Sequence, residues 1–290
     1  MPSRTALLAL LASACTTEIS EPIETDSAIT CWIETAHRDV PIFGAVTASG
    51  VLVRHPDGDL LIDGGNSTHM KQEIEVYSGG DKLFLETISA QLAPMRPLPD
   101  ALAAAGLPNG ELDLFLPSHI HIDHVGGLID LPDVPVLMPA AELAVMQRGL
   151  AQTIFEVVPA HAQRIAPLAR QLVFDGPPIA VFGESADIFG DGSVIVVPLP
   201  GHTPGSVGTF FNVGTTRVFH VGDAVSTLDQ IDANTGKQFP MNRTDSDPDV
   251  TLETVNLLHA LHAFDPALKI VPAHDRVAWE QAFGAPGACR

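Results

Sequence analysis

The chain has 290 residues, 46% of them hydrophobic, and a formal net charge of −20. A chain of this length and composition can bury the core of one large domain or of two small ones. The excess of acidic residues argues against nucleic acid as a partner, because phosphates are bound by Lys and Arg side chains.

The first fifteen residues have the pattern of an export signal. Arg4 precedes an apolar run over residues 6–12, and small residues then lead to Cys15. A cysteine in that place resembles the lipidation site of a bacterial lipoprotein, and an ordinary secretory signal or a disordered start is the alternative. We expect a signal peptide over residues 1–15, with Cys15 lipidated on the periplasmic side of a bacterial membrane, or a secreted protein. Residues 16–28 are polar and acidic and predict a tether.

Residues 29–290 are the predicted domain. Cys31 and Cys289 lie near its two ends, and in an exported protein they form either a disulfide or two unpaired thiols. Residues 50–54 and 59–63 predict a hairpin, because Pro-Asp-Gly between two apolar runs is a turn signal. This hairpin places Asp63 at a strand end.

Residues 66–107 predict helices that are broken at glycines and prolines. His69, Met70 and Tyr77 in this region could line a pocket, but a surface position is expected for each. Residues 112–117 then predict a strand.

The next residues, His119, His121, Asp123 and His124, put three imidazoles and a carboxylate within six positions. If the backbone is extended, His119 and His121 point the same way, because side chains alternate along a strand. Asp123 and His124 follow where a helix would begin, so they point at a neighbouring position. Imidazole nitrogen and carboxylate oxygen are common zinc ligands. The motif therefore predicts two metal positions.

Later segments add three more polar residues at strand ends. Residues 194–197 predict a strand that ends at the loop of His202. A hairpin of residues 206–211 and 216–221 ends at Asp223, and a strand over residues 269–272 leads to His274. His220 lies an odd number of positions before Asp223, so it should face away and be structural. The other predicted strands are 135–138, 172–174 and 180–182, and the predicted helices are 140–148, part of 152–170, one from 247–248, and 275–283.

Together these segments resemble the metallo-β-lactamase superfamily. The family motif His-x-His-x-Asp-His is complete at residues 119–124, and four more family segments are present in order: Asp63-Gly64-Gly65, Gly201-His202-Thr203-Pro204-Gly205, Gly222-Asp223 and Pro272-Ala273-His274. The resemblance implies an α/β fold, a four-layer αββα sandwich. It places His119, His121 and His202 on one metal and Asp123, His124 and His274 on a second. Asp223 would bridge them, and Asp63 would fix a histidine ligand without touching metal.

The resemblance also implies a hydrolase with two Zn²⁺, or Fe or Mn in their place, that attacks a small molecule with a metal-bridging hydroxide. Asp123 would orient that hydroxide or pass its proton on. An ester or lactone is the first expectation for the substrate, and a phosphodiesterase or a β-lactamase-type hydrolase is the alternative. Acyl-homoserine lactonases have a similar size and ligand set, but their catalytic tyrosine would fall near Ser226. Two alternatives belong to other classes of protein. One is a persulfide dioxygenase with one iron on His119, His202 and Asp223, and the other is a decayed binding protein.

Overall fold

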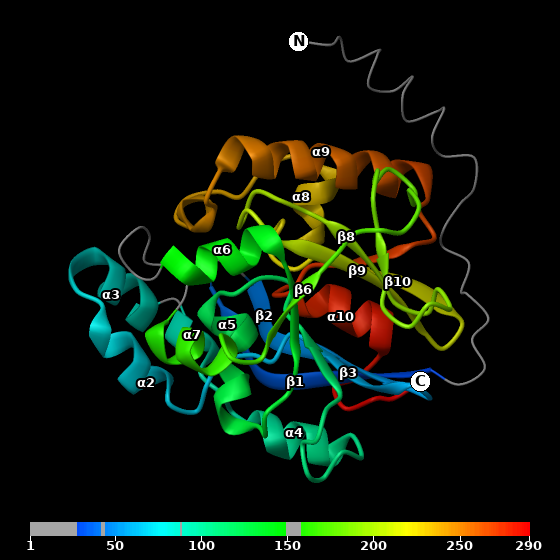
Figure 1. Cartoon of the computed structure of the whole chain (residues 1–290). Coiled ribbons are helices and arrows are strands. Elements are labelled where there is room, and N and C mark those ends of the chain that lie inside the picture. The colour runs from blue at the N-terminus through cyan, green and yellow to red at the C-terminus, as the bar shows by residue number, and fades with distance from the viewer. Residues whose placement is uncertain (1–27, 42–43, 88, 149–157) are drawn as a thin grey trace.

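Two β-sheets face each other in the structure, a computed structural model that describes residues 28–41, 44–87, 89–148 and 158–290 (Figure 1). The predicted signal peptide, Cys15 and residues 16–27 of the predicted tether lie outside the described residues. Within the described part, no helix is both long enough and apolar enough to span a membrane.

The first sheet has six strands in the order β1-β2-β3-β4-β5-β6. Its first three strands are antiparallel, and β3 to β6 run parallel. The predicted hairpin of residues 50–63 is confirmed, because β2 and β3 pair directly with His55 opposite Gly58. The strands are β1 (Ile29–Val40), β2 (Gly44–His55), β3 (Gly58–Ile62), β4 (Leu114–Leu116), β5 (Val136–Pro139) and β6 (Ala169–Leu172).

The second sheet has five strands in the order β11-β10-β9-β8-β7, and only β10 and β11 are parallel. The predicted hairpin about Gly214 is confirmed as β9 and β10, and Gly214 has the positive φ of 57° that a tight turn favours. The strands are β7 (Ala186–Asp187), β8 (Ile195–Pro198), β9 (Val207–Val213), β10 (Thr216–His220) and β11 (Lys269–Val271).

Two predicted strands are wrong or misplaced. Residues 172–174 were expected to be extended, but β6 ends at Leu172. Residues 180–182 form a turn, in which Ala180 has a φ of 51° and a single bridge joins Ile179 to Phe182. A short apolar run cannot by itself distinguish a strand from a buried turn.

Helices cover the outer faces of both sheets. The longest, α9 (Pro248–Phe264), starts as predicted, with Asp247 accepting hydrogen bonds from the backbone N–H groups of Asp249 and Val250 and with Pro248 in the first turn. The other α-helices are α2 (Met70–Glu73), α3 (Gly79–Thr87), α4 (Leu98–Ala104), α5 (Ile122–Val125), α6 (Ala140–Arg148), α7 (Pro159–Ile165), α8 (Leu228–Asp232) and α10 (Arg276–Phe283).

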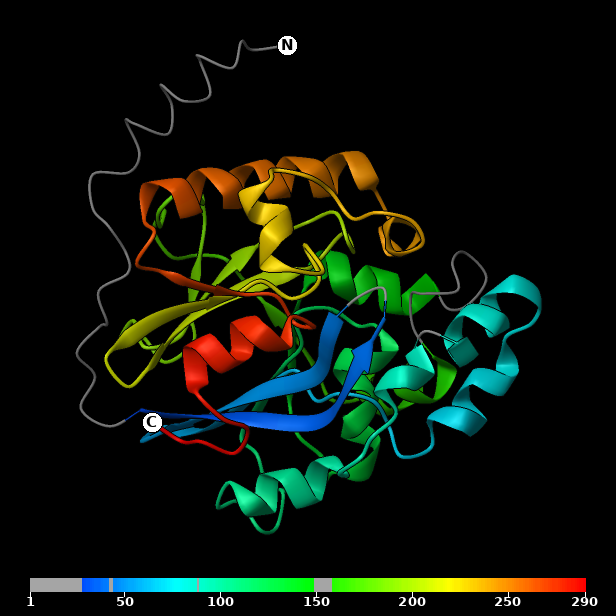
Figure 2. The ribbon, with the colours of Figure 1, turned by 180° about the vertical axis from the view of Figure 1, so that it is seen from behind.

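Strand alternation divides the apolar side chains into three layers. In β3, Leu61 packs on the helical side with α4, while Leu60 and Ile62 face the other sheet. In β10, Val218 faces the first sheet and Phe219 packs towards α9. Figure 2 shows the result: α9 and α8 cover one sheet, α4 lies beneath the other, and α10 lies beside the gap between them. The predicted four-layer αββα sandwich is confirmed.

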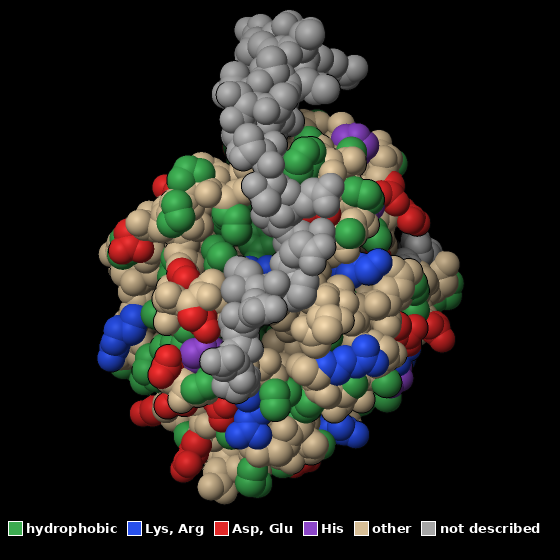
Figure 3. Space-filling model, turned by 90° about the vertical axis from the view of Figure 1, so that its right-hand side faces the viewer, with side chains coloured by type: hydrophobic (Ala, Val, Ile, Leu, Met, Phe, Trp, Pro, Cys, Tyr) green, Lys and Arg blue, Asp and Glu red, His purple; other side chains and the backbone are tan. Residues whose placement is uncertain are grey.

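The C-terminus is fastened to the first strand. Cys31 and Cys289 form a disulfide, one of the two alternatives left open by the sequence. Thr30 and Arg290 also exchange two backbone hydrogen bonds of 2.8 and 2.9 Å. On the face that contains this end of the molecule in Figure 3, basic side chains lie singly among acidic and apolar ones.

Candidate metal centre

Polar side chains follow the carboxyl ends of five strands. Asp63 follows β3, the motif of residues 119–124 follows β4, and His202, Asp223 and His274 follow β8, β10 and β11. Because β3 and β4 are parallel, as are β10 and β11, their ends meet at the same edge of each sheet. The two sheets face each other, so all these residues gather at one end of the sandwich.

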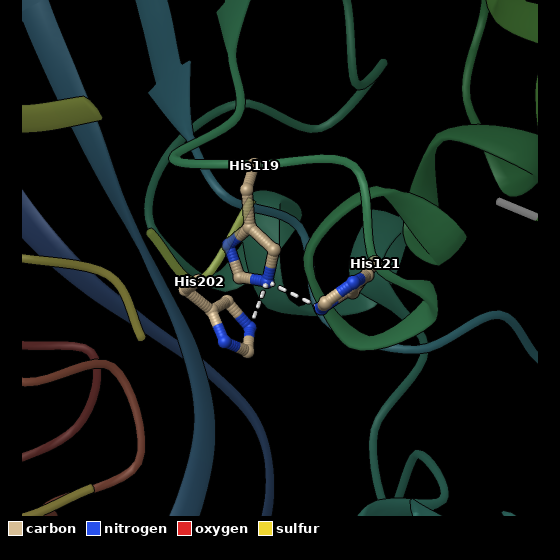
Figure 4. Close-up of side chains that lie close together, drawn as sticks. All are labelled: His119, His121 and His202. Carbon is tan, nitrogen blue, oxygen red and sulfur yellow. Dashed lines mark hydrogen bonds between the residues drawn. The ribbon is translucent and has the colours of Figure 1, made fainter. Parts of the chain in front are cut away.

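The first group consists of three imidazoles. His119 Nε2 lies 3.0 Å from His121 Nδ1 and 3.1 Å from His202 Nε2, so the three nitrogens point at one another (Figure 4). All three residues are buried. The expectation that His119 and His121 point the same way is confirmed, and His121 has the extended backbone that this requires.

The second group consists of Asp123, His124 and His274. Asp123 Oδ2 lies 3.3 Å from His274 Nε2, and Asp123 Oδ1 lies 3.9 Å from His124 Nε2. Asp123 and His124 come from the short helix α5 and His274 from the loop after β11. Each of the two groups offers ligand atoms that all lie within 4.8 Å of one another, as a shared metal ion requires.

Asp223 lies between the two groups. Its Oδ2 is 3.5 Å from His202 Nε2, and its Oδ1 is 3.5 Å from His124 Nε2 and 3.3 Å from His274 Nε2. One carboxylate oxygen therefore faces each group. The structure brings together all seven residues that the sequence singled out as ligands.

The site has the features expected of a divalent-metal site. His124 Nε2 and Asp223 Oδ1 are buried and make no hydrogen bond with any described residue. Leaving such groups unpaired costs free energy, and a cation between them would satisfy both. Five imidazoles and two carboxylates form a nitrogen and oxygen donor set that suits zinc, iron or manganese.

The surroundings of the first group keep its three imidazoles in the form that can bind a cation. Burial lowers the pKa of His119 and His121 well below its usual value, and neighbouring imidazoles lower it further. Burial also lowers the pKa of His202, and the Lys237 ammonium adds to this effect. These rings are therefore neutral at pH 7, and neutral imidazole is the form that binds metal.

The second group behaves differently because it contains carboxylates. Burial favours neutral His124, but the Asp63 and Asp223 carboxylates override it and raise the pKa of His124 to about 10. Burial likewise opposes the charge on Asp123, yet the hydrogen bond with His274 lowers the pKa of Asp123 to about 2. Without a cation, protons on the imidazoles balance these carboxylates.

Asp63 holds His124 in place from the side of its ring that faces away from the candidate metal centre. It is fully buried and has a φ of 55°, a left-handed backbone that is uncommon outside glycine. Its carboxylate accepts hydrogen bonds from Ser118 N, Ser118 Oγ, His124 Nδ1 and His220 Nε2 at 2.7 to 3.0 Å. His220 thus lies behind the ligands, in agreement with its predicted structural role. Gly50 allows this close fit, because a Cβ there would lie 2.0 Å from the Asp63 carbonyl oxygen.

Three supporting residues were not predicted from the sequence. Buried Glu142 in α6 accepts hydrogen bonds from Ile120 N and from Thr203 Oγ1, and so joins the loops of the first group. Asp245 Oδ1 lies 2.9 Å from His202 Nδ1, and Lys237 Nζ lies 2.7 Å from the same oxygen. Each is a single residue far along the chain from the residues that it contacts, so no local motif marks it.

A cavity of about 380 Å³ opens over the two groups. His121, Asp123, His202, Asp223 and His274 form its polar base. Its walls are mostly apolar and include Val40, Val46, Phe84, Leu85, Leu92, Ile122, Val158, Phe239 and Met241, with Ser226 and Thr227 among its polar members. An apolar pocket with a few convergent polar groups is typical of small-molecule sites.

One expectation about this cavity is corrected. Tyr77 and Met70 were expected at the surface, but Tyr77 lines the cavity and is 8% exposed, and Met70 is buried beside it. Burial raises the pKa of the Tyr77 hydroxyl, and Asp81 raises it further. Met70 and Tyr77 pack with Leu85, Ile122 and Val158 in one apolar cluster, and this tertiary contact buries both side chains. His69 is exposed, as expected.

Comparison with known proteins agrees with this fold and site. The model of the metallo-beta-lactamase superfamily matches residues 44–274, and the chain belongs to this superfamily. It is a superfamily hydrolase with metal-binding groups of histidine and aspartate.

Its similar relatives include lactonases. The chain is 23% identical over 242 residues to the N-acyl homoserine lactonase AttM of Rhizobium johnstonii, covering 81% of this chain and 84% of that protein. It is 24% identical over 246 residues to AttM of Azorhizobium caulinodans, with the same coverage. A solved structure of an N-acyl homoserine lactone hydrolase, with the product N-hexanoyl-L-homoserine at its catalytic metal centre, matches with a TM-score of 0.62 and 17% identity. It covers 89% of this chain and 97% of that one.

Proposed function

We propose that this protein is a dinuclear zinc hydrolase that opens an ester or lactone carbonyl of a small molecule. The observation that carries the proposal is the pair of complete ligand groups joined by Asp223 at the base of an apolar cavity. His119, His121 and His202 would hold one ion, Asp123, His124 and His274 the other, and Asp223 both. Bound zinc would supply a Lewis acid and a water-derived nucleophile at neutral pH.

Side chains around the base of the cavity would assist the attack and bind the substrate. Asp123 is the more exposed of the two carboxylates there, with 18% of its side chain accessible against 10% for Asp223. Asp123 therefore is the carboxylate that would orient the attacking water and accept its proton. The apolar walls would bind the hydrocarbon part of the substrate and exclude bulk water.

Two observations favour an ester or lactone. The similar relatives at 23 and 24% identity bear the name lactonase. The cavity walls also offer apolar contacts suited to an acyl group. The position expected for the lactonase tyrosine falls at Ser226 or its neighbours, none of which is a tyrosine, and the chain's one tyrosine, Tyr77, lines the same cavity from another element.

Metal analysis and a substrate panel test the proposal together. The full chain, loaded with zinc and dialysed, should hold two zinc ions, and it should hydrolyse lactones or aryl esters faster than phosphodiesters or β-lactams. A preference for phosphodiesters or β-lactams would show that the substrate is of that class and not an ester or lactone. One tightly held iron with turnover of persulfides would instead support the oxygenase alternative, and no bound metal would support the decayed binding protein.

We also propose that residues 1–15 direct export and that Cys15 carries a lipid anchor. The Cys31–Cys289 disulfide supports an exported protein, because disulfides persist in oxidising compartments. Expression of the full chain in a bacterium, followed by fractionation, tests this. The protein should sediment with membranes, and Cys15→Ser should remain with uncleaved signal or appear in the soluble fraction. A cleaved form of Cys15→Ser that sediments with membranes as fully as the wild type would contradict lipidation.

A further inference from the structure

Lys237 and Asp245 form a buried triangle with the back of the His202 ring. Lys237 Nζ lies 2.7 Å from Asp245 Oδ1 and 2.8 Å from His202 Nδ1, and Asp245 Oδ1 lies 2.9 Å from His202 Nδ1. The side chains of Lys237 and Asp245 are only 1% and 2% exposed. Neither residue belongs to the seven that form the two ligand groups.

In this triangle His202 Nδ1 can either donate to Asp245 or accept from Lys237, and binding of a cation by the ring selects the first form. His202 Nε2 faces His119 and Asp223, so it must present a lone pair if it is to bind a cation. The ring proton then lies on Nδ1 and is donated to Asp245 Oδ1. The Lys237 ammonium, which can only donate, is bonded to the same oxygen. A carboxylate held in this way fixes both the tautomer and the rotation of the ring.

The same two residues close the base of a loop. We call residues 238–244 the wall loop, because Gln238, Phe239, Met241 and Thr244 within it line the cavity. Just beyond it, Ser246 N donates to the His202 carbonyl oxygen at 2.9 Å, and Asp247 N donates to that of Gly201 at 3.0 Å. The wall loop thus starts and ends on the segment that carries His202.

Stability alone does not account for the buried pair. Burying an ammonium and a carboxylate is costly, and an apolar pair of similar volume is often as stable or more so. The wall loop could be closed by apolar contacts. What an apolar pair could not supply is an acceptor for His202 Nδ1.

We propose that Lys237 and Asp245 are positioning residues that hold the His202 ring and the wall loop as one unit. The wall of the substrate cavity and one ligand of the first metal position are therefore coupled through two buried side chains. The part that concerns substrate rests on the proposed function, whereas the part that concerns metal binding does not.

The test compares three variants of the full chain: Asp245→Asn, Lys237→Met and the double variant. Lys237→Met alone leaves a buried, unpaired carboxylate and should be strongly destabilised, so the double variant, which removes both charges, keeps the comparison possible. Lys82→Met and Asp133→Asn make the same chemical changes in more exposed ion pairs and are the controls, because neither pair includes a ligand residue. Zinc affinity is measured by competition with a chromophoric chelator, and the coordination of Co²⁺ by its visible absorption.

We expect Asp245→Asn and the double variant to bind the zinc held by His119, His121 and His202 about 10- to 100-fold less tightly and to change the cobalt spectrum. The controls should match the wild type in both. At saturating zinc, KM should rise most for substrates with the longest apolar group, because the wall loop is no longer fixed. Wild-type zinc affinity and cobalt spectra in both variants would overturn the proposal. Failure to hydrolyse any ester or lactone would contradict the proposed function. The zinc and cobalt measurements would still decide whether Lys237 and Asp245 position His202.

Discussion

His124 Nδ1 donates a hydrogen bond to Asp63 Oδ2 over 3.0 Å, on the side of the ring that faces away from the candidate metal centre. A proton is thereby kept on Nδ1, so Nε2, which faces Asp223 Oδ1 at 3.5 Å, is the nitrogen that loses its proton when metal binds. A strand-end residue with a left-handed backbone thus decides which nitrogen of a ligand histidine points at the metal position.

Asp63→Asn should weaken both the fold and the metal centre. The amide keeps one acceptor oxygen but turns an NH₂ group towards Ser118, His124 or His220, all of which donate to the carboxylate. We expect a loss of about 1–3 kcal/mol in the free energy of unfolding and zinc binding about 10- to 100-fold weaker. Denaturant unfolding and zinc competition measure the two effects. Asp113→Asn, which removes an acceptor for Asp59 N at the surface, should change neither by a comparable amount.

His121→Ala should lose zinc and turnover together. The change removes one of three nitrogens from the first group and leaves the second group complete. The variant should therefore bind one zinc in place of two, as counted by atomic emission after dialysis. His161→Ala is the matched control, since His161 is equally buried but lies beside Glu73. It should lower the melting temperature and keep both ions. Undiminished hydrolysis by His121→Ala would rule out the assigned site.

The sequence predicted the ligands well because each lies at a strand end next to a local signal. The Pro-Asp-Gly turn places Asp63, and the dense motif of residues 119–124 needs only an extended backbone and a following helix to split into two groups. Alternation along β10 also separated structural His220 from Asp223. In these cases the short-range pattern contains most of the geometry.

What the sequence could not predict depends on contacts between distant segments. Glu142 lies in the first turn of α6, where an acidic residue is common, and nothing nearby shows that it reaches Thr203. Lys237 and Asp245 stand in a loop without periodicity, although both contact His202. Tyr77 is buried because it packs in one apolar cluster with residues of α2, α3 and α5. Burial of a single polar side chain is a tertiary property that no local spacing records.

Glu142→Gln should loosen the first ligand group in particular. Glu142 Oε1 accepts from Ile120 N at 2.9 Å, and Oε2 accepts from Thr203 Oγ1 and Gly205 N at 2.8 and 3.0 Å. An amide at this position must turn a donor towards one of these donors. We expect a loss of about 1–3 kcal/mol in stability, together with weaker binding of one zinc. Glu73→Gln, a buried acid that touches neither ligand loop, is the control. Equal effects of the two changes on zinc affinity would contradict this role.

Removal of the disulfide should destabilise the fold without changing the metal centre. The Cys31–Cys289 bond joins positions 258 residues apart, so its loss frees almost the whole domain in the unfolded state. The double change Cys31→Ser and Cys289→Ser should lower the free energy of unfolding by about 2–5 kcal/mol. Zinc affinity should stay the same, and reductant should lower the melting temperature of the wild type but not of the variant. A wild-type melting curve insensitive to reductant would show that the cysteines are unpaired.

Zinc binding should release protons, and the number should depend on pH in a defined direction. His119, His121 and His202 have lowered pKa values and are neutral at pH 7, so they release none. Burial opposes a proton on His124 or His274, but nearby carboxylates raise the pKa of His124 to about 10 and that of His274 well above its usual value. Both rings are therefore protonated at pH 7 in the metal-free protein and must become neutral to bind zinc, so the rings contribute about two protons per chain beyond any from zinc-bound water. The release should fall as the pH rises through about 10, where His124 has already lost its proton. Titration calorimetry in buffers of different ionisation enthalpy measures it, and a binding enthalpy independent of buffer at pH 7 would show that the two rings carry no proton to lose.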